Sequence, residues 1–452
     1  MKKINLKNKK IAVIGLGSSG ISAANLLNRL GAYVFVSEIK REEDIVEQID
    51  QLKKGIKYEL GLHSEKILDS ELIIKSPGVS NHLPILISAR ERNIPIWSEL
   101  ELSYRLINKP MKLIAVTGTN GKTTTVTLLG KIFNDTGYKT VVAGNIGRPL
   151  SDFVDDIDSD TVVILEISSY QLENIVEFKP DIGCILNITP DHLEHHKTMD
   201  EYILSKRNIF INQSESDYCV FNKNDIESYK LSKSCKSKVV YFSYKKKVSN
   251  GVYYTDRKFV INLKKFNICY QELTENLKIP GKHNIENVLA AIAISSIFGL
   301  EPDKIEKVVN EFTGVEHRIE LVREIDGVKY FNDSKSTNVD STKVALESFD
   351  NPIILIMGGR DKGAPYSPLK NLIKNKVKTL LLVGESADKI KHDLFGTTKI
   401  IDCIDIKTAV LKAREIASEN DIVLLSPGCS SFDQFKNFEH RGKYFKEIVN
   451  NL

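Results

Sequence analysis

The most informative segment of this chain is Leu113-Ile-Ala-Val-Thr-Gly-Thr-Asn-Gly-Lys-Thr-Thr-Thr125. Its apolar run leads directly into a glycine turn, a lysine and threonines, which predicts a buried strand, a tight loop and the start of a helix. Glycines allow several backbone N–H groups to point at phosphate oxygens, and a helix N-terminus adds partial positive charge. The segment therefore predicts a binding site for a nucleoside triphosphate.

The lysine and the first threonine of this turn have separate expected roles. Lys122 would contact the outer phosphates, and Thr123 would offer its hydroxyl to Mg²⁺. The general pattern G-x-x-x-x-G-K-S/T requires a glycine where the chain has Val116, so the loop is a shorter form that starts at Gly118. This variant argues against GTPase switches and motor proteins. The alternative is a glycine turn that only links a strand to a helix.

The composition is that of an ordinary soluble protein, with 452 residues, 42% hydrophobic and 27% charged. This length allows about two to four domains, each with its own core. The net charge is only +4 and the lysines are spread along the chain, so no basic patch predicts nucleic acid or anionic lipid as a partner. No apolar stretch approaches the length of a membrane span, and no secretion signal is evident.

The cysteines show no C-x-x-C or other metal-binding spacing. Most of them are therefore expected to be packing residues with reduced thiols, as in a cytoplasmic protein. They are Cys184, Cys219, Cys235, Cys269, Cys403 and Cys429.

Apolar β-like runs alternate with helical patterns along the chain, which predicts the α/β class. The expected divisions are a small α/β unit at 1–109, a central block at 110–314 and a third unit at 315–452. The central block would carry a β-rich insertion at 238–270 and a helix at 285–298. Further strands are expected at 10–14, 33–37, 72–75, 94–96, 162–167, 182–188, 353–357, 379–383 and 421–425.

A second glycine motif, G-x-G-x-x-G, follows the first expected strand at Gly15, Gly17 and Gly20, and Glu38 ends the next strand. Alone this pattern is weak, because it requires only a pyrophosphate near a helix N-terminus. A nucleotide diphosphate sugar fits it as well as NAD or FAD does, and a purely structural turn is a third possibility. The loop at 76–78 follows a neighbouring strand and would close over the same crevice.

The central block supplies further groups that a phosphoryl-transfer site needs. Glu166 lies inside an otherwise apolar strand, where a carboxylate is costly unless it binds a cation or another partner. His192 follows the strand at 182–188, where loops gather at the carboxyl end of a parallel sheet. His195 and His196 lie farther into a polar loop and are expected to be solvated bystanders.

Several short motifs, in the same order along the chain, resemble those of the Mur ligases, the family that builds the peptide of the bacterial cell-wall precursor. They are Gly118-Thr-Asn-Gly-Lys-Thr123, Gly144-Asn-Ile-Gly147, Glu166-Ile-Ser-Ser-Tyr-Gln-Leu-Glu173, Asp191-His192, Tyr202-x-x-x-Lys206, His283-Asn284-x-x-Asn287 and Glu316-His317-Arg318. The resemblance covers essentially the whole chain.

Two later segments resemble the D-glutamate-adding branch of that family. They are Phe331-Asn-Asp-Ser-Lys-Ser-Thr-Asn338 and Leu425-Ser-Pro-Gly-Cys-Ser-Ser-Phe-Asp-Gln-Phe-Lys-Asn-Phe438. Sibling ligases and folylpolyglutamate synthases carry a different segment in place of the first. One departure is Glu38-Ile-Lys40, where the family usually has an Asp-Thr-Arg-like turn that contacts the uridine end of the substrate.

The resemblance implies a Rossmann-like UDP-binding domain, a central P-loop ATPase domain and a C-terminal Rossmann-like domain. The implied substrates are ATP, UDP-N-acetylmuramoyl-L-alanine and D-glutamate. The γ-phosphoryl group would pass to the alanine carboxylate, and the amine of D-glutamate would attack the resulting acyl phosphate. A monomeric, cytoplasmic enzyme without nucleic acid partners or membrane insertion is expected.

The resemblance also implies roles for individual residues. Those for ATP are Gly118, Thr119, Asn120, Gly121, Lys122, Thr123, Thr124, Asn284, Asn287, His317, Arg318 and Asp333. Those for the UDP-linked substrate are Gly17, Ser18, Ser19, Glu38, Ser76, Pro77, Gly78 and Asn145. Those for D-glutamate are Lys335, Thr337, Lys362, Ser431 and Phe438.

Two Mg²⁺ ions are implied, with ligands at Thr123, Glu166, His192 and Lys206. Lys206 would be carbamylated by CO₂, which turns a cation into an oxygen ligand for a hard metal. Lys122, His192 and Lys206 would be the catalytic residues. Without the resemblance, Lys206 would be interpreted as a solvent-exposed helix lysine, and Lys362 retains a surface-loop alternative.

Three classes of function remain at this point. The first is an ATP-dependent ligase, either for D-glutamate or, as in a sibling enzyme, for L-glutamate or another amino acid. The second is a nicotinamide-dependent oxidoreductase that uses the first glycine motif. The third is a regulatory NTPase whose hydrolysis drives binding to a partner protein.

Overall fold

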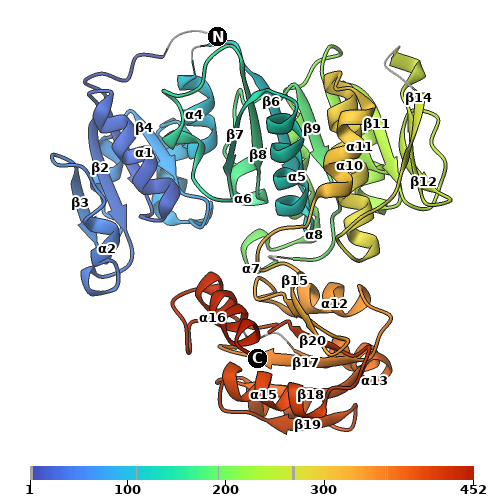
Figure 1. Ribbon diagram of the computed structural model, residues 1–452. Helices are drawn as coiled ribbons and strands as arrows, with labels where there is room; N and C mark the ends of the chain where they lie inside the picture. The colour runs from blue at the N-terminus through green and yellow to red at the C-terminus, as the bar shows by residue number, and fades with distance from the viewer. Residues whose placement is uncertain (1–3, 108, 192, 267–269, 362, 364) are drawn as a thin grey trace. The chain divides into compact units, whose positions relative to one another are not determined.

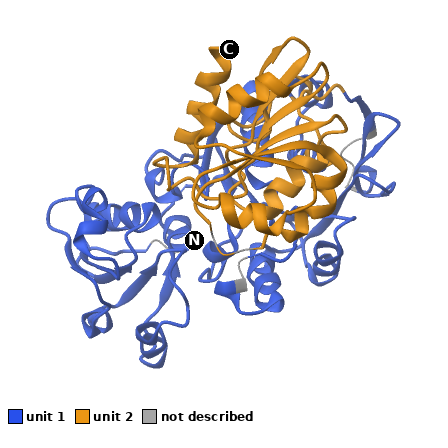
Figure 2. Cartoon of the chain, turned by 90° about the horizontal axis from the view of Figure 1, so that it is seen from below, with its two compact units in different colours: residues 1–275, 286–308 blue, residues 276–285, 309–452 orange. Residues whose placement is uncertain are grey.

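The computed structural model describes residues 4–107, 109–191, 193–266, 270–361, 363 and 365–452. The chain divides into two compact units, one of residues 1–275 with 286–308 and one of residues 276–285 with 309–452 (Figure 2). Within the described residues, no helix combines the length and the apolar character that a membrane crossing requires.

The first sheet of the first unit is parallel, with the strand order β3-β2-β1-β4-β5 (Figure 1). Its strands are β1 (Lys10–Ile14), β2 (Tyr33–Glu38), β3 (Lys57–Leu60), β4 (Leu72–Lys75) and β5 (Ile96–Ser98). The helices and 3-10 turns between them are α1 (Ser18–Arg29), η1 (Glu42–Asp44), α2 (Val46–Ile49), η2 (Glu65–Asp69), α3 (Pro84–Glu91) and α4 (Glu99–Leu106).

Alternate residues of β1 enter two different cores. Ile11 and Val13 pack with side chains of α1 and α4, whereas Ala12 and Ile14 pack with side chains of α3. Helices therefore cover both faces, which explains why residues 11–14 of the strand are all apolar rather than alternating. The expected α/β unit is confirmed, and the loops after β1 and β4 lie at its carboxyl edge.

The second sheet of the first unit has the order β14-β13-β12-β11-β10-β9-β6-β8-β7. Its strands are β6 (Lys112–Thr117), β7 (Lys139–Gly144), β8 (Thr161–Glu166), β9 (Ile182–Ile185), β10 (Tyr218–Asn222), β11 (Lys238–Ser243), β12 (Gly251–Thr255), β13 (Lys258–Asn262) and β14 (Tyr270–Thr274). The strands from β7 to β12 pair in parallel, and β13 and β14 are antiparallel additions. The β-rich region expected at 238–270 thus extends the central sheet.

Helices of the same part of the chain connect and cover these strands, and α5 lies along β6, β7 and β8 (Figure 1). They are α5 (Lys122–Asp135), α6 (Ser169–Leu172), α7 (Leu193–His196), α8 (Met199–Arg207), α9 (Ile226–Leu231), α10 (Lys282–Phe298) and α11 (Pro302–Glu311). The 3-10 turns are η3 (Leu150–Asp152), η4 (Asn208–Phe210), η5 (Ser232–Ser234) and η6 (Lys264–Phe266).

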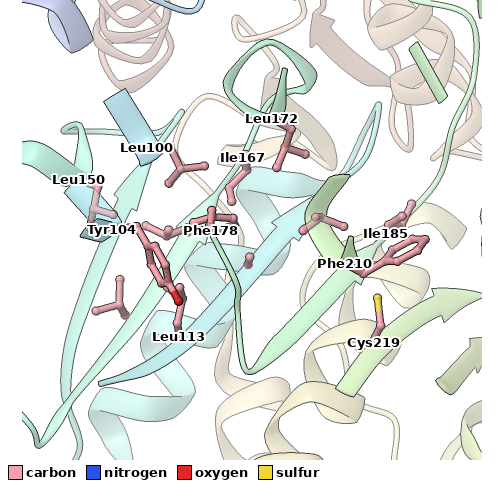
Figure 3. Packing of buried hydrophobic residues seen from close by; sticks show 14 of the residues in the cluster. Leu100, Tyr104, Leu113, Leu150, Ile167, Leu172, Phe178, Ile185, Phe210 and Cys219 are labelled. Atoms are coloured by element: carbon pink, nitrogen blue, oxygen red, sulfur yellow. The ribbon is translucent and has the colours of Figure 1, made fainter. Parts of the chain in front are cut away.

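The core of the central sheet also includes side chains of α4, the helix that follows the last strand of the first sheet (Figure 3). Leu100 and Tyr104 of α4 are buried in it, and the Tyr104 ring meets Phe178 edge-on at a centroid distance of 5.4 Å. The buried carboxylate of Glu101 accepts hydrogen bonds from the backbone N–H groups of residues 176–178. The two sheets of the first unit are therefore joined by a packed and hydrogen-bonded contact.

The second unit contains a sheet with the order β15-β16-β20-β17-β18-β19, parallel except for β15. Its strands are β15 (Glu320–Ile325), β16 (Val328–Asn332), β17 (Ile353–Gly358), β18 (Val377–Val383), β19 (Lys399–Asp402) and β20 (Ile422–Leu425). Its helices and 3-10 turn are α12 (Val339–Glu347), η7 (Ser367–Leu369), α13 (Lys370–Lys376), α14 (Ala387–Asp393), α15 (Ile406–Ile416) and α16 (Phe438–Asn450).

Both faces of this sheet are covered as well. Alternate residues of β17 enter the core shared with α12 to α14 and the core shared with α15 and α16. This pattern confirms the expected α/β character of residues 315–452. The expected strands are present with small shifts: the strand expected at 94–96 is β5 at Ile96–Ser98, and the one expected at 182–188 already ends at Ile185.

Candidate active site

The turn that is predicted to bind phosphate lies between β6 and α5, where the sequence predicts it. Gly121 has a φ angle of +86°, and a Cβ atom there would lie 2.1 Å from Oδ1 of Asn287. Only glycine suits both the left-handed backbone and this close contact. Asn287, on α10, therefore lies directly against the turn at the N-terminus of α5.

The loop after β9 holds the same turn by backbone hydrogen bonds. The N–H of Thr119 donates to the carbonyl of Asn187 (2.9 Å), and the N–H of Asn120 donates to the Asn187 side-chain oxygen (2.8 Å). The Thr119 hydroxyl also lies 3.0 Å from the hydroxyl of Tyr202 on α8. These contacts preorganise the turn, which is the property that electrostatic stabilisation of a transferring phosphoryl group requires.

Lys122 is the first residue of α5. Its ammonium group donates to the backbone carbonyls of Gly118 (2.8 Å) and Thr119 (2.9 Å). The charge therefore lies over the turn, where a lysine that binds phosphates is needed. Thr123 and Thr124 follow in the first turn of the same helix.

Glu166 ends β8, beside the strand that precedes the turn, and is 3% exposed. Its Oε1 accepts a hydrogen bond from Nδ2 of Asn145 (2.8 Å). Its Oε2 is buried, and among the described residues nothing donates a hydrogen bond to it. A buried carboxylate oxygen of this kind is costly unless it has a cation or donor, so Glu166 fits the predicted role of a metal ligand.

Lys206 lies on α8 and is 1% exposed. Its ammonium group donates to the carbonyl of Gly118 (2.9 Å) and lies 4.6 Å from the ring centroid of Tyr202. Burial and the nearby charge of Lys122 hold the pKa of Lys206 well below its usual value, while Asp191 acts in the opposite direction. Burial therefore shifts the protonation equilibrium of this side chain toward the uncharged amine.

The predicted UDP-substrate residues line one cavity of about 660 Å³ in the first unit. Its walls come from the glycine turn after β1, the loops after β2 and β4, and the loop after β7. The structure brings together Gly17, Ser18, Ser19, Glu38, Ser76, Pro77, Gly78 and Asn145. Lys40, His63 and Gln171 also line this cavity.

Glu38 connects two walls of the cavity. One carboxylate oxygen accepts from the N–H of Leu16 (2.7 Å) and the other from the N–H of Lys40 (3.0 Å). The residue as a whole is 8% exposed, and both of its carboxylate oxygens already have backbone partners. Its geometry supports the shape of the glycine turn first, and any ribose contact would share an oxygen with those bonds.

In the second unit, Asp333 lies at the carboxyl end of β16 and is fully buried. One of its oxygens accepts from the N–H of Ile319 (3.2 Å), and the other accepts from the hydroxyls of Ser336 and Ser426. The guanidinium of Arg318 is 3.7 Å away. Burial raises the pKa of Asp333, and Arg318 opposes that shift.

His317 directly precedes Arg318 and lies in a strained loop. Its φ angle is +64°, and the β-branched Ile319 has a φ angle of +46°, which is rare for such a residue. Nδ1 of His317 lies 2.9 Å from the Asn332 amide nitrogen, and its carbonyl accepts from the N–H of Lys335 (3.0 Å). Such strain persists where surrounding contacts enforce it, and it is frequent at functional sites.

The predicted D-glutamate residues in the second unit lie on two loops that Arg441 joins. The Arg441 guanidinium, 2% exposed, donates to the hydroxyl and carbonyl of Ser334 and to the carbonyls of Cys429 and Ser430. It thus fixes the loop after β16 to the loop after β20. The first loop carries Lys335 and Thr337, and the second carries Ser431 and leads into α16, which begins at Phe438. Nζ of Lys335 lies 5.6 Å from the Phe438 ring centroid.

Comparison with known proteins accounts for the whole chain. A Clostridioides difficile protein named UDP-N-acetylmuramoylalanine--D-glutamate ligase is 44% identical, and the alignment covers 99% of this chain and 100% of the relative. The chain belongs to the Mur ligase family. The family models that match are the MurD-like N-terminal domain (residues 9–98), the Mur ligase middle domain (116–295) and the glutamate ligase domain (317–429).

Two further relatives agree with this membership. An Alkaliphilus metalliredigens protein of the same name is 42% identical, with 99% of both chains covered. The solved structure of a pseudomurein peptide ligase type C from Methanothermus fervidus has 21% identity and a TM-score of 0.60, covering 98% of this chain and 100% of that one. The latter similarity supports the Mur ligase fold. Mur ligases are ATP-dependent amide ligases.

The predicted ATP residues of this Mur ligase are distributed over both units. The turn residues and Asn287 belong to the first unit, whereas Asn284, His317, Arg318 and Asp333 belong to the second. His192 and Lys362 lie outside the described residues. Their roles therefore stay predictions.

The interpretation of His195 and His196 as solvated bystanders was wrong. Their side chains are 14% and 3% exposed, and both face the carboxylate of Glu173. The polar loop expected there contains α7, which packs against α8. Without the family resemblance, Lys206 would be interpreted as a solvent-exposed lysine, and this interpretation is wrong as well. Its side chain points from α8 toward Gly118 and is buried.

Three residues that position the site had no role predicted from the sequence: Asn187, Tyr202 and Arg441. Asn187 directly follows an apolar strand, which is a usable signal, because side chains at the carboxyl edge of parallel strands gather together. Tyr202 lies four residues before Lys206, hence on the same helix face. Arg441 gave no signal, since an arginine on an amphipathic helix is normally solvated.

Proposed function

We propose that this chain is the ligase that joins D-glutamate to UDP-N-acetylmuramoyl-L-alanine, with conversion of ATP to ADP and phosphate. The observation that carries the proposal is the 44% identity over 99% of the chain to a relative that bears this activity in its name. The loop after β16, which carries Lys335, supports it. That loop provides the ammonium and hydroxyl groups that a dicarboxylate substrate needs.

The reaction requires positioning and neutralisation of charge more than covalent help from the protein. A carboxylate oxygen of the alanine attacks the γ-phosphorus of ATP, the bond to the β–γ bridging oxygen breaks, and ADP leaves. The amine of D-glutamate then attacks the acyl carbon, loses a proton, and phosphate leaves. Lys122, held over the turn, would stabilise the charge that develops on the transferring group.

Mg²⁺ would supply a fixed double positive charge beside the phosphoryl oxygens. Thr123 and Glu166 are the proposed ligands of one ion, and the buried oxygen of Glu166 supports this assignment. For a second ion we propose His192 and Lys206. Because carboxylates and carbamates suit hard cations, this ligand set fits Mg²⁺ better than a softer metal.

Carbamylation of Lys206 is part of the proposal. The neutral amine would attack the carbon of CO₂, a C–N bond would form, and one proton would leave to solvent to give an anionic carbamate. The depressed pKa of Lys206 supports this step, since the reacting species is the uncharged amine. Its position next to Gly118 would place the new oxygens beside the phosphate-binding turn.

We also propose the division into domains at 1–109, 110–314 and 315–452, with the boundaries near 109 and 314 acting as hinges. Each matching family model falls inside one of these ranges. Closure would exclude water from the acyl phosphate. Small-angle scattering with and without ATP analogue and substrate tests the hinges, and identical profiles would contradict them. A monomeric, cytoplasmic enzyme without nucleic acid partners stays a prediction.

The activity is tested by phosphate release with a panel of amino acids. We expect turnover only when ATP, UDP-N-acetylmuramoyl-L-alanine and D-glutamate are all present. Preference for L-glutamate or another amino acid would indicate a sibling specificity. Phosphate release without the other substrates would indicate a regulatory NTPase, and an absorbance change with NAD would indicate an oxidoreductase.

A further inference from the structure

Two histidines and a glutamate, none of which has a role in the proposed ligase reaction, face one another in the first unit. Nε2 of His195 lies 2.7 Å from Oε1 of Glu173, and Nδ1 of His196 lies 3.4 Å from the same oxygen. One ligand atom from each residue lies within 4.8 Å of the other two. We propose that Glu173, His195 and His196 form a binding site for a divalent transition-metal ion. The chemistry of the ligands favours Zn²⁺, and the site is separate from the Mg²⁺ sites of the proposed reaction.

The spacing of the three ligand atoms suits a small ion. In a tetrahedral zinc site with ligand bonds of about 2.0–2.2 Å, neighbouring ligand atoms are separated by about 3.3–3.6 Å. The contact of His196 with Glu173 is already at that distance. The contact of His195 with Glu173 is that of a hydrogen bond, so an ion that replaces the proton between them requires a shift of less than about 1 Å.

The two imidazole rings are held in orientation by further contacts. The other ring nitrogen of His196, Nε2, lies 2.8 Å from the hydroxyl of Ser169. The ring of Tyr170 stacks on His196 at a centroid distance of 5.4 Å and meets His195 edge-on at 4.3 Å. A hydrogen bond on the second nitrogen is the usual way in which a metal-binding histidine is oriented.

The carboxylate of Glu173 is divided between two tasks. Its Oε2 accepts hydrogen bonds from Nδ2 of Asn81 (2.8 Å) and Nζ of Lys75 (3.1 Å), while Oε1 faces the histidines. The outer partners hold the side chain in place and leave Oε1 to a metal ion, as in known sites with hydrogen-bonded carboxylate ligands.

The three side chains are largely shielded from solvent, yet a metal ion could reach them through a cavity. The side chains of Glu173, His195 and His196 are 11%, 14% and 3% exposed. They line a cavity of about 310 Å³, together with residues of α8 and the loop after β4. An ion bound to the three ligands would therefore face a space that holds water molecules, which complete its coordination.

The donor set selects the class of ion. Two imidazole nitrogens and one carboxylate oxygen suit Zn²⁺, Co²⁺ or Ni²⁺, whereas Mg²⁺ and Ca²⁺ require mostly oxygen ligands. The ammonium of Lys75 on Oε2 offsets the only negative charge of the cluster. That further disfavours hard cations, whose binding depends on ligand charge more than on imidazole donation.

A bound ion would connect the segment that follows α6 to α7. Glu173 directly follows α6, and both histidines belong to α7, which precedes the helix that carries Lys206. The ion would stabilise the folded chain, because a ligand that binds only the native state raises its stability. It would act as a structural tie beside the active site rather than as a reactant.

The test uses the full-length protein after removal of metals by a chelator. The protein is incubated with Zn²⁺ in a large excess of Mg²⁺, separated from free metal, and analysed for bound zinc. We expect about one Zn²⁺ per chain for the wild type, as for a single site. His195→Gln and His196→Gln should bind none, whereas His392→Gln, which alters an exposed histidine of the second unit, should bind as the wild type does.

Two further measurements make the outcome decisive. Zn²⁺ should raise the thermal unfolding midpoint of the wild type and of His392→Gln but not that of the two cluster variants, which reports on the folded state of each. Glu166→Gln should retain its zinc, since Glu166 belongs to the reaction site. Three results would overturn the proposal: no zinc bound to the wild type, zinc retained by both cluster variants, or zinc lost only from Glu166→Gln. None of these results bears on the ligase activity.

Discussion

At the scale of single residues, Lys122 should be essential for turnover and dispensable for folding. Lys122→Ala removes the ammonium that lies over the phosphate-binding turn. Loss of a preorganised electrostatic group of this kind lowers turnover by about a hundredfold or more. Steady-state phosphate release checks the rate, and thermal unfolding checks the fold.

The matched control is Lys131→Ala on the same helix, where the lysine forms an exposed i,i+4 ion pair with Asp135. Such a pair contributes little to stability, and its loss should leave turnover unchanged. A folded Lys122→Ala protein that turns over like the Lys131→Ala protein would refute the assignment of the turn.

Lys206 should be required as a carbamate and not as a cation. Lys206→Ala should be severely impaired, and Lys206→Arg should be no better, because arginine keeps a charge but forms no carbamate. Formate or acetate should restore part of the activity of Lys206→Ala by entering the space left by the side chain. Activity of each variant with and without these acids is the measurement.

The modification itself can be observed with ¹³C-labelled bicarbonate by NMR. The wild type should show a carbamate signal that disappears in Lys206→Ala. Since the pKa of Lys206 is depressed, the signal should be present near neutral pH and decrease as acid protonates the amine. Substantial ligase activity in Lys206→Arg would show that the carbamate is not needed.

His283 should make the stability of the second unit depend on pH. Burial, reinforced by the charge of Arg318, lowers its pKa to about 3 from a usual value of 6.5. The unfolded chain therefore takes up a proton below about pH 6.5 that the folded chain refuses, so this contribution to stability is present above pH 6.5 and is lost as the pH falls toward 3.

The measurement compares wild type and His283→Gln in urea unfolding at about pH 8 and about pH 5. The wild type should lose up to about 2 kcal/mol more than the variant over this interval. Since other acids titrate in both proteins, only the difference between the two losses is diagnostic. Equal losses would mean that His283 is protonated in the folded chain.

Residue type alone was enough to single out those candidate site residues that stand in unusual sequence surroundings. Lys122 and Glu166 could be assigned from their own context, because a lysine after a glycine turn and an acid in an apolar strand rarely occur without a ligand or a partner. Lys206 and His196 could not, since their burial depends on how α7 and α8 pack against the central sheet. That packing is a tertiary property with no local signal.

At the scale of elements, the turn between β6 and α5 should tolerate no side chain at Gly121. Gly121→Ala would place a Cβ atom 2.1 Å from Oδ1 of Asn287 and displace either the turn or α10. A displacement of about 1 Å at a phosphate-binding site costs about a hundredfold in rate. ATP binding by calorimetry and turnover both measure the effect.

Gly137→Ala is the matched control, because Gly137 has a similar φ angle of +92° but no atom within 4 Å of its Cβ position. Both substitutions introduce the backbone strain of a left-handed residue, about 1–2 kcal/mol. Only Gly121→Ala should lose ATP binding. Equal loss in both variants would attribute the effect to general destabilisation.

Buried strands were the most predictable elements. β1, β8 and β17 are apolar over most of their length because helices cover both faces of their sheets, and such runs are recognisable in the sequence. β7 was missed, since it lies at the edge of the central sheet and most of its residues are only partly buried. An edge strand lacks the apolar pattern that burial imposes.

At the scale of the whole molecule, the order of motifs carried more information than any one of them. The motif at Gly15 to Gly20 left dinucleotide, UDP-sugar and structural interpretations open. In the structure, a Cβ atom at Gly20 would lie 1.9 Å from the carbonyl oxygen of Gly15. Close packing is therefore a sufficient reason for a glycine at this position. The UDP-sugar interpretation depends on the rest of the chain, which aligns with a Mur ligase over 99% of its length.

In the proposed reaction, ATP activates the alanine carboxylate before D-glutamate attacks it. The most direct measurement uses UDP-N-acetylmuramoyl-L-alanine with ¹⁸O in that carboxylate, followed by mass spectrometry of the phosphate and of the nucleotide product. Transfer of one carboxylate oxygen to phosphate, together with a product enlarged by one glutamate residue, is the predicted result with D-glutamate. Unlabelled phosphate would contradict the acyl-phosphate route, and absence of the enlarged product would contradict the ligase assignment itself.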